Sequence, residues 1–164
     1  MNTPLPYGHQ SIDESDIAEV VGVLKSDFLT TGPKVREFEK ALAEQCECKY
    51  AIAVSSGTAA LHLAYAVAGL GPGYELITSP LTFAATANAA LMVGADVKFC
   101  DVESDSFILD SAKVEKSITE KTRVIAPVDF AGLAADIDTF KAISQNHNII
   151  VIEDAAHALG ARKN

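Results

Sequence analysis

The stretch E-L-I-T-S-P-L-T-F-A-A-T-A-N-A-A-L-M-V-G-A-D-V-K-F-C, residues 75–100, decides the fold. Residues 75–78 and 96–100 have the length and the content of β-branched and aromatic side chains that are typical of strands. Residues 83–93, between them, are rich in alanine and predict a helix. Two strands joined by a helix require a crossover connection, so they are expected to lie parallel in one sheet. The stretch therefore predicts an α/β fold.

Strand and helix signals alternate along the rest of the chain as well. Residues 50–54 (Y-A-I-A-V) are a short apolar run, typical of a strand that is buried on both faces of a parallel sheet. The pattern predicts a three-layer α/β/α arrangement with a mostly parallel sheet and helices on both faces. Further strands are expected at residues 122–126 and 148–153, and further helices at residues 11–25, 34–45, 57–68, 111–117 and 136–145.

The composition argues against several classes of protein. Hydrophobic residues make up 49% and charged residues 21% of the 164 positions, which is the balance of a soluble globular protein. The net charge of −9 disfavours a nucleic-acid or anionic-membrane surface, and no stretch approaches the roughly 20 apolar residues of a membrane span. Residues 1–10 lack the features of a secretion signal. Cys46, Cys48 and Cys100 fit a reducing compartment and lack the second ligand pair of a zinc site, so we expect a cytoplasmic protein without a metal.

The first candidate for chemistry is S-S-G-T, residues 55–58, between a predicted strand and a predicted helix. A helix N-terminus offers free N–H groups and the positive end of the helix dipole, which together can hold a phosphate. Gly57 lets the backbone approach such a ligand closely. The alternative is a serine that caps the helix without any ligand. Position alone leaves both interpretations open.

Two further candidates follow predicted strands. Asp154 comes directly after residues 148–153, and ligands of open parallel sheets lie beyond the carboxyl ends of the strands. Its carboxylate could hold a positively charged ring nitrogen, with His157 one turn further on; the alternative is a capping aspartate and a solvated histidine. Phe83, in the loop after residues 75–78, could stack on a flat cofactor, although spacing alone favours a core position.

Seven motifs stand in order along the chain: T-T-G-P (residues 30–33), F-E (38–39), S-S-G-T-A-A-L (55–61), P-L-T-F-A-A-T-A (80–87), G-A-D-V-K-F-C-D-V (94–102), P-V-D-F-A-G (127–132) and E-D-A-A-H-A-L-G (153–160). Each motif alone is weak evidence, but the ordered set is specific and spans essentially the whole chain. It resembles the DegT/DnrJ/EryC1/StrS family of sugar aminotransferases, which belong to the fold-type-I enzymes that depend on pyridoxal 5'-phosphate (PLP).

The resemblance implies how the chain would bind this cofactor. Gly57 and Thr58 would hold the phosphate through their backbone N–H groups, and Phe83 would stack on the pyridine ring. Asp154 would keep the ring nitrogen protonated, which makes the ring an electron sink. His157 would lie near the phenolic oxygen of the ring. Residues 1–48 would be an N-terminal helical segment of the large domain, and residues 49–164 an incomplete PLP-binding α/β domain.

The resemblance also implies substrates and a partner. Tyr7, Asp27, Phe28, Leu29 and Thr30 match the region where such enzymes contact the nucleotide sugar, and the enzymes build their sites at a homodimer interface. The histidine in D-A-A-H-A-L-G and the segment V-D-F-A-G resemble the aminotransferases of the pseudaminic-acid pathway. Those enzymes act on a UDP-linked 4-keto-6-deoxy amino sugar with glutamate as the amino donor. No nucleic-acid or membrane partner is expected.

One part of the family pattern is missing. The Schiff-base lysine and a phosphate-binding serine would lie past Asn164, as would the smaller C-terminal domain, and Lys163 is too close to Asp154 to be that lysine. We therefore expect an N-terminal part that is inactive by itself. One alternative is a sugar 3-dehydratase of the same family, in which histidine replaces the lysine. Another is a non-catalytic regulatory or binding protein, although such a protein need not keep the residues of a cofactor site.

Overall fold

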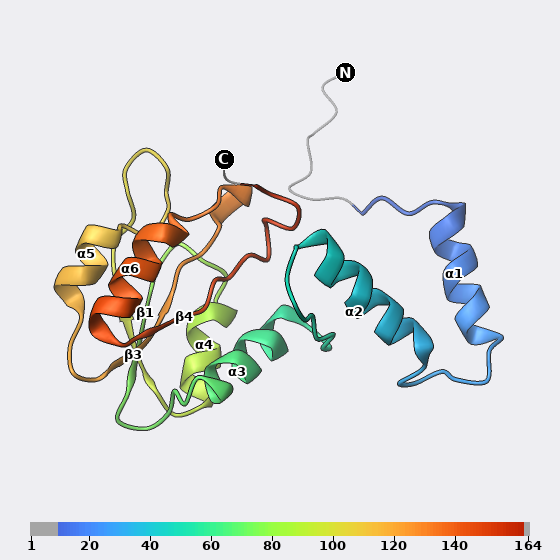
Figure 1. The fold of residues 1–164 in the computed structure, drawn as a ribbon, viewed down its shortest axis with the longest axis horizontal. Coiled ribbons are helices and arrows are strands. Elements are labelled where there is room, and N and C mark those ends of the chain that lie inside the picture. Colours follow the sequence, from blue (N-terminus) through green and yellow to red (C-terminus); the bar gives the residue numbers. More distant parts are fainter. Residues whose placement is uncertain (1–9, 163–164) are drawn as a thin grey trace, which may run out of the picture. The chain divides into compact units, whose positions relative to one another are not determined.

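The computed structural model describes residues 10–162, and the chain divides into two compact units, Met1–Ala53 and Val54–Asn164. They are the N-terminal unit and the C-terminal unit of the text below. Helices α1 (Glu14–Leu24) and α2 (Pro33–Gln45) make up most of the described N-terminal unit (Figure 1). Across residues 10–162, no helix has the length and apolar character that a membrane crossing requires.

Local sequence signals set the starts of α1 and α2. The Asp13 side chain accepts hydrogen bonds from two N–H groups of the first turn of α1 (2.8 and 3.2 Å), and the Asp16 side chain accepts one from the Asp13 N–H (3.0 Å). This capping box satisfies donors that a helix start leaves unpaired. α2 begins with Pro33, whose missing N–H costs nothing at that position. Gly32 precedes it, where a Cβ would lie only 2.9 Å from the Cβ of Phe28.

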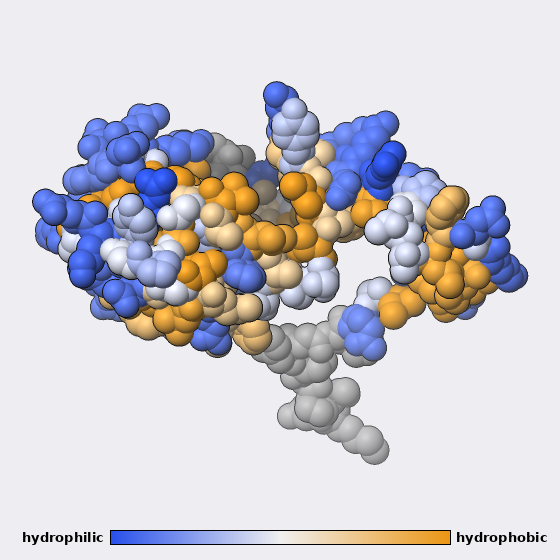
Figure 2. All heavy atoms as spheres, turned by 90° about the horizontal axis from the view of Figure 1, so that it is seen from below, coloured by the Kyte–Doolittle hydropathy of each residue, from blue (hydrophilic) through white to orange (hydrophobic). Residues whose placement is uncertain are grey.

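The N-terminal unit has little core of its own. No residue of α1 or α2 is buried. Figure 2 shows apolar surface over α1, at the right of the view. The large apolar side chains exposed on the two helices are those of Ile17, Val20, Val21, Leu24, Val35 and Phe38. Stable helices of this length normally bury an apolar face against another element, and these faces lack such a partner among residues 10–53.

The C-terminal unit is built on a four-stranded parallel sheet in the order β2-β1-β3-β4. Its elements alternate along the chain as expected: α3 (Gly57–Val67), β1 (Glu75–Thr78), α4 (Ala85–Met92), β2 (Asp96–Phe99), α5 (Ser111–Ser117), β3 (Thr122–Ala126), a 3-10 turn η1 (Phe130–Gly132), α6 (Ile137–His147) and β4 (Ile150–Val151). The predicted helices and four of the predicted strands are confirmed within a few residues.

The sheet separates two apolar cores, which makes three layers. Leu76 and Val124 point to one face and pack with α3 and α4, including Leu61 and Ala89. Their chain neighbours point to the other face and pack with α5 and α6. Figure 1 shows the two helix pairs on opposite sides of the sheet. The predicted α/β/α fold class is confirmed.

Residues 50–54 do not form the predicted strand. Tyr50 is 75% and Ile52 is 78% exposed, so the run is not buried on both faces. No described strand pairs with it, and the Ala53 N–H donates instead to the Glu39 carboxylate at 2.9 Å. A strand needs a neighbour that completes its ladder of hydrogen bonds, and the apolar composition of the run says nothing about that neighbour.

The last strand is shorter than predicted, but its hydrogen bonding continues. Asn148 adopts a left-handed conformation (φ 55°) and ends α6, which leaves only Ile150–Val151 as β4. Past β4, the Asp154 N–H donates to the Pro127 carbonyl (2.9 Å), and the Asp129 N–H donates to the Asp154 carbonyl (3.0 Å). Asp154 is thereby fixed beside the extension of β3, at the carboxyl end of the sheet.

Candidate functional site

Asp154 is the centre of a polar cluster at the carboxyl end of the sheet. It is half-buried, and its Oδ2 accepts a hydrogen bond of 2.6 Å from the Thr86 hydroxyl. Its Oδ1 accepts a longer bond of 3.3 Å from the Ala156 N–H. The side chain thus bonds to a residue 68 positions away along the chain as well as to its own turn. The interpretation of Asp154 as only a local cap is too narrow.

Two threonines at helical spacing orient this carboxylate. The Thr82 and Thr86 hydroxyl oxygens are 2.7 Å apart. Because the Thr86 hydroxyl has one proton and its shortest bond is to the carboxylate, the Thr82 hydroxyl donates to Thr86 and Thr86 donates to Asp154. Thr86 lies in the first turn of α4, where the helix dipole favours a negative charge. Both threonines belong to P-L-T-F-A-A-T-A, but sequence analysis gave them no role.

Tyr65 supports the cluster from α3. Its side chain is fully buried, and its hydroxyl donates a 3.1 Å hydrogen bond to the Thr86 carbonyl. Burial raises the pKa of the Tyr65 phenol, and the negative charge of Asp154 raises it further. The cluster therefore links three elements through Thr86, which accepts from Tyr65 and donates to Asp154. These elements are α3, α4 and the segment after β4.

Phe83 lies on the loop that leads from β1 into α4. Its carbonyl accepts a 3.1 Å hydrogen bond from the Thr86 N–H, so its backbone belongs to the same turn as the threonine that holds Asp154. Its ring is 76% exposed. The core position that spacing alone favoured is therefore wrong, and the ring is available to contact a ligand.

Gly57 and Thr58 begin α3, as predicted. The Ser56 hydroxyl accepts a 3.1 Å bond from the Ala59 N–H and caps the helix. In the part of the chain that the structure describes, no hydrogen bond occupies the N–H groups of Gly57 and Thr58. A Cβ placed on Gly57 would meet no atom within 4 Å. The serine cap is thus present, and beside it the N–H groups of Gly57 and Thr58 have no partner among the described residues, so phosphate binding there stays a prediction.

His157 lies in the turn after Asp154, and its side chain is exposed. Its ring faces Phe130, with ring centroids 6.5 Å apart and planes tilted by 58°. Its carbonyl would be 3.2 Å from a Cβ at position 132, where Gly132 has φ +87°. The structure therefore associates His157 with the turn after β3, and it shows no hydrogen bond from His157 to Asp154 among the described residues.

The predicted sugar-binding residues lie in the N-terminal unit. Tyr7 is outside the described residues. Asp27, Phe28, Leu29 and Thr30 form the exposed link between α1 and α2. Phe28 and Leu29 line a small cavity of about 170 Å³, below the roughly 300 Å³ at which small-molecule pockets usually begin. This cavity alone is too small for a nucleotide sugar.

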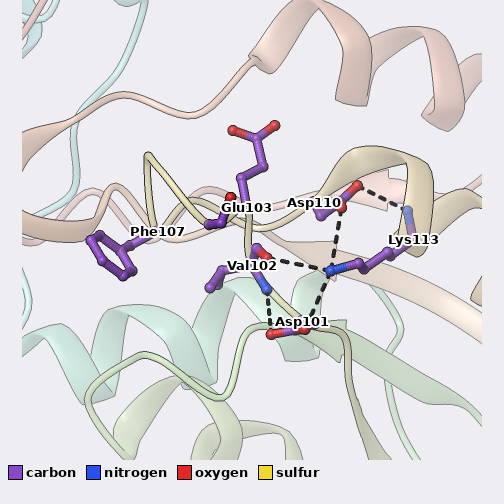
Figure 3. A pocket seen from close by; sticks show the side chains of 7 residues that line it. Asp101, Val102, Glu103, Phe107, Asp110 and Lys113 are labelled. Carbon is purple, nitrogen blue, oxygen red and sulfur yellow. Dashed lines mark hydrogen bonds and ion pairs between the residues drawn. The ribbon is translucent and has the colours of Figure 1, made fainter.

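A larger cavity of about 460 Å³ follows β2 and was not predicted. Lys113 lies at its wall and bonds to the Asp101 carboxylate (3.2 Å), the Val102 carbonyl (3.4 Å) and the Asp110 carboxylate (3.5 Å). Figure 3 shows Glu103 and Phe107 pointing away from these contacts. The Lys113 contacts thus join the 101–110 loop to α5.

The family model of the DegT/DnrJ/EryC1/StrS aminotransferases matches residues 10–164. The spore coat polysaccharide biosynthesis protein SpsC of Bacillus subtilis is 45% identical over 155 residues, which are 94% of this chain and 40% of that protein. The UDP-4-amino-4,6-dideoxy-N-acetyl-beta-L-altrosamine transaminase of Campylobacter jejuni is 48% identical over 160 residues, which are 96% of this chain and 42% of that protein. The chain thus spans about two fifths of the length of these curated relatives.

Solved structures with the same fold point to the same family. Spr1654 of Streptococcus pneumoniae, described as a sugar aminotransferase and solved in its PLP form, matches with a TM-score of 0.89 at 34% identity, over 95% of this chain and 44% of that one. The 3-amino-5-hydroxybenzoic acid synthase matches with a TM-score of 0.88 at 36% identity, over 92% of this chain and 40% of that one. Because the family model matches residues 10–164 and the solved structures share the fold, the chain belongs to the DegT/DnrJ/EryC1/StrS aminotransferase family. The cofactor of this family is pyridoxal phosphate.

Proposed function

We propose that this chain is the cofactor-binding part of an enzyme that moves an amino group from an amino acid to a nucleotide-linked keto sugar. The observation that carries the proposal is the Asp154 carboxylate, which the Thr86 hydroxyl holds at the carboxyl end of the sheet. Thr86 belongs to the same turn as Phe83, whose ring is exposed. A fixed negative charge and an exposed aromatic ring suit a flat, positively charged ring. A purely structural aspartate would need no exposed aromatic residue on the turn of the threonine that holds it.

The residues present fit pyridoxal phosphate. The unpaired N–H groups of Gly57 and Thr58 would hold its phosphate, and the Phe83 ring would stack on the pyridine. An ionised carboxylate has about four acceptor sites, and the described bonds of Asp154 to Thr86 and Ala156 use two of them. Asp154 therefore keeps the capacity to accept a hydrogen bond from a protonated ring nitrogen.

Each side chain would have a distinct task in the reaction. The bound cofactor supplies an electron sink when the amino-acid substrate loses its Cα proton. Asp154 would keep a proton on the ring nitrogen, because its negative charge stabilises the pyridinium form. The hydroxyls of Thr82 and Thr86 would keep that carboxylate oriented, and Phe83 would exclude water from one ring face. His157 remains our candidate for the phenolic oxygen.

We further propose a UDP-linked 4-keto-6-deoxy amino sugar as acceptor and glutamate as donor, in the biosynthesis of a surface polysaccharide. The resemblance of D-A-A-H-A-L-G and V-D-F-A-G supports this choice, as do the functions that the names of the Campylobacter jejuni transaminase and the Bacillus subtilis spore coat protein describe. Tyr7, Asp27, Phe28, Leu29 and Thr30 would contact the nucleotide sugar. The active form would be a homodimer.

Titration of this chain with pyridoxal phosphate, followed by cofactor absorbance, tests the cofactor site. We expect weak, saturable binding, and we expect Asp154→Asn to weaken it by at least about tenfold, because a charged hydrogen bond contributes about 1.5–3 kcal/mol and about 1.4 kcal/mol is a factor of ten. The matched control is Asp138→Asn, which neutralises a 90% exposed carboxylate and should leave the affinity unchanged. Equal binding by Asp154→Asn would remove Asp154 from the site.

Borohydride reduction and peptide mapping of the same samples test the part of the reaction that this chain can carry out. We expect no lysine of the chain to become labelled at one stoichiometric position. Stoichiometric labelling of a single lysine, with turnover of an amino donor, would show that the chain is a complete enzyme.

A further inference from the structure

The turn after β3 and the turn after β4 meet at the carboxyl end of the sheet. They carry the motifs V-D-F-A-G (residues 128–132) and E-D-A-A-H-A-L-G (residues 153–160). The Asp129 N–H of the first motif donates a 3.0 Å hydrogen bond to the Asp154 carbonyl of the second. The parallel sheet thus brings two distant motifs together, and His157 lies in the second of them.

Asp129 anchors the turn of residues 129–132. Its side chain is 4% exposed, and its Oδ1 accepts a 2.8 Å hydrogen bond from the Ala135 N–H. Its carbonyl accepts a 3.1 Å bond from the Gly132 N–H. Because its own N–H is bonded to Asp154, Asp129 fixes the turn through three polar groups. Without the carboxylate, the Ala135 N–H would lose its acceptor in a buried place, which is costly.

Two residues of this turn face His157. Phe130 packs against the core beside α6, and its ring centroid is 6.5 Å from that of the His157 imidazole. Gly132 has φ +87°, and a Cβ on it would lie 3.2 Å from the His157 carbonyl oxygen, which is tighter than most contacts of a Cβ. Glycine therefore lets the turn approach the backbone of His157 without a clash.

The backbone of the turn is strained. Ala131 is left-handed as well (φ 55°), although its Cβ makes that conformation unfavourable. Such a conformation persists only where the surrounding structure imposes it. The bonds of Asp129 on one side and the backbone of His157 on the other are contacts that can do so.

We propose that residues 129–132 are the positioning element for His157. Asp129 anchors the turn, Gly132 admits the His157 backbone, and Phe130 supports the imidazole. None of the three need touch the cofactor. An exposed imidazole without support samples several rotamers, and restricting them in advance lowers the entropy that ligand binding costs. The role toward the cofactor's phenolic oxygen rests on the proposed function, whereas the support of His157 by the turn does not.

The χ1 rotamer of His157, measured by NMR from three-bond coupling constants in this chain without cofactor, tests the support. We expect one dominant rotamer in the wild type and averaging among rotamers in Phe130→Ala and in Gly132→Ala. Gly73→Ala is the matched control, because Gly73 also has φ +87° but a Cβ on it would meet no atom within 4 Å. It should leave the His157 rotamer unchanged. Rotamer averaging in the wild type, or one unchanged rotamer in both turn variants, would overturn the proposal.

Two substitutions test Asp129 as the anchor. Asp129→Ala removes the acceptor of the Ala135 N–H and should release the His157 rotamer. Asp129→Asn keeps an oxygen in that place and should restore the wild-type rotamer. If Asp129→Ala keeps the single rotamer, Asp129 is not the anchor of the turn.

The affinity for pyridoxal phosphate, followed by cofactor absorbance, tests the role toward the phenolic oxygen. We expect Phe130→Ala to weaken binding by about two- to tenfold, which is the effect of about one hydrogen bond. In a chain that already carries His157→Ala, the same change should have no further effect, because the two residues act together. An equal loss with and without His157 would overturn this role.

The outcomes separate the two proposals. If the wild-type chain does not bind pyridoxal phosphate, the proposed function fails together with the role toward the phenolic oxygen. The rotamer measurement then still decides whether the turn positions His157. If one turn variant does not fold, the other variant and the wild-type coupling constants remain decisive.

Discussion

The two units are both helical at their surfaces, but only one of them buries its apolar side chains. In the C-terminal unit, Tyr65 and Phe140 are fully buried between helices and sheet. In the N-terminal unit, Phe38 is 58% exposed and no residue of either helix is buried. The comparison shows that caps are enough to define where a helix begins, whereas cooperative stability requires a second layer to pack against.

The largest expected contrast comes from one substitution made in both units. Phe140→Ala should lower the free energy of unfolding of the C-terminal unit by about 3–5 kcal/mol, because it leaves a cavity in the core beside α6. Phe38→Ala should change it by less than about 0.5 kcal/mol, because its ring is already exposed. Urea unfolding followed by circular dichroism measures both. Similar losses would mean that Phe38 is buried in solution by a contact outside its own unit.

A smaller effect is expected from the hydroxyl that holds Asp154. Thr86→Val keeps the shape of the buried side chain but removes the donor to the carboxylate, so it should cost about 1.5–3 kcal/mol of stability. Thr86→Ser restores the hydroxyl and should recover most of this loss. If the Thr86→Val and Thr86→Ser variants have the same free energy of unfolding, the hydrogen bond to Asp154 contributes nothing to stability.

The smallest effect compares two aspartate caps. Asp13 caps α1 and Asp110 caps α5, each through two N–H groups. Either change to alanine should destabilise its helix by about 0.5–2 kcal/mol. Because α5 packs on a core and α1 does not, Asp110→Ala should lower global stability, whereas Asp13→Ala should only speed amide exchange in α1. Faster exchange throughout the chain after Asp13→Ala would show that the two units unfold together.

The sequence predicted what local chemistry controls. The alternation of strands and helices, the position of Asp154 after the last strand and the start of a helix at Gly57 all follow from neighbours in the chain. It failed for residues 50–54, because strand formation there depends on a partner that an apolar run does not specify. Phe83 was ambiguous because spacing cannot distinguish an exposed ring from a core ring.

The contacts that hold the site together could not be predicted, because they join distant parts of the chain. Thr82 and Thr86 are four residues apart, which indicates a shared helical face, but nothing local connects Thr86 to Asp154. Asp129 and Glu153 are 24 positions apart, and the parallel pairing of β3 with β4 places both at the wall of one cavity. Knowledge of the strand order would have been needed to find both.

The burial of Tyr65 gives the protein an optical reporter. The chain has no tryptophan, so its near-ultraviolet signal comes mainly from tyrosines. Among the described tyrosines, Tyr50 and Tyr74 are 75% and 44% exposed, whereas Tyr65 is fully enclosed. Among these three, an added quencher will therefore reach Tyr50 and Tyr74 more easily than Tyr65, whose hydroxyl is bonded to the residue that holds Asp154. Fluorescence from Tyr65 will report on events at that carboxylate without any dye or label.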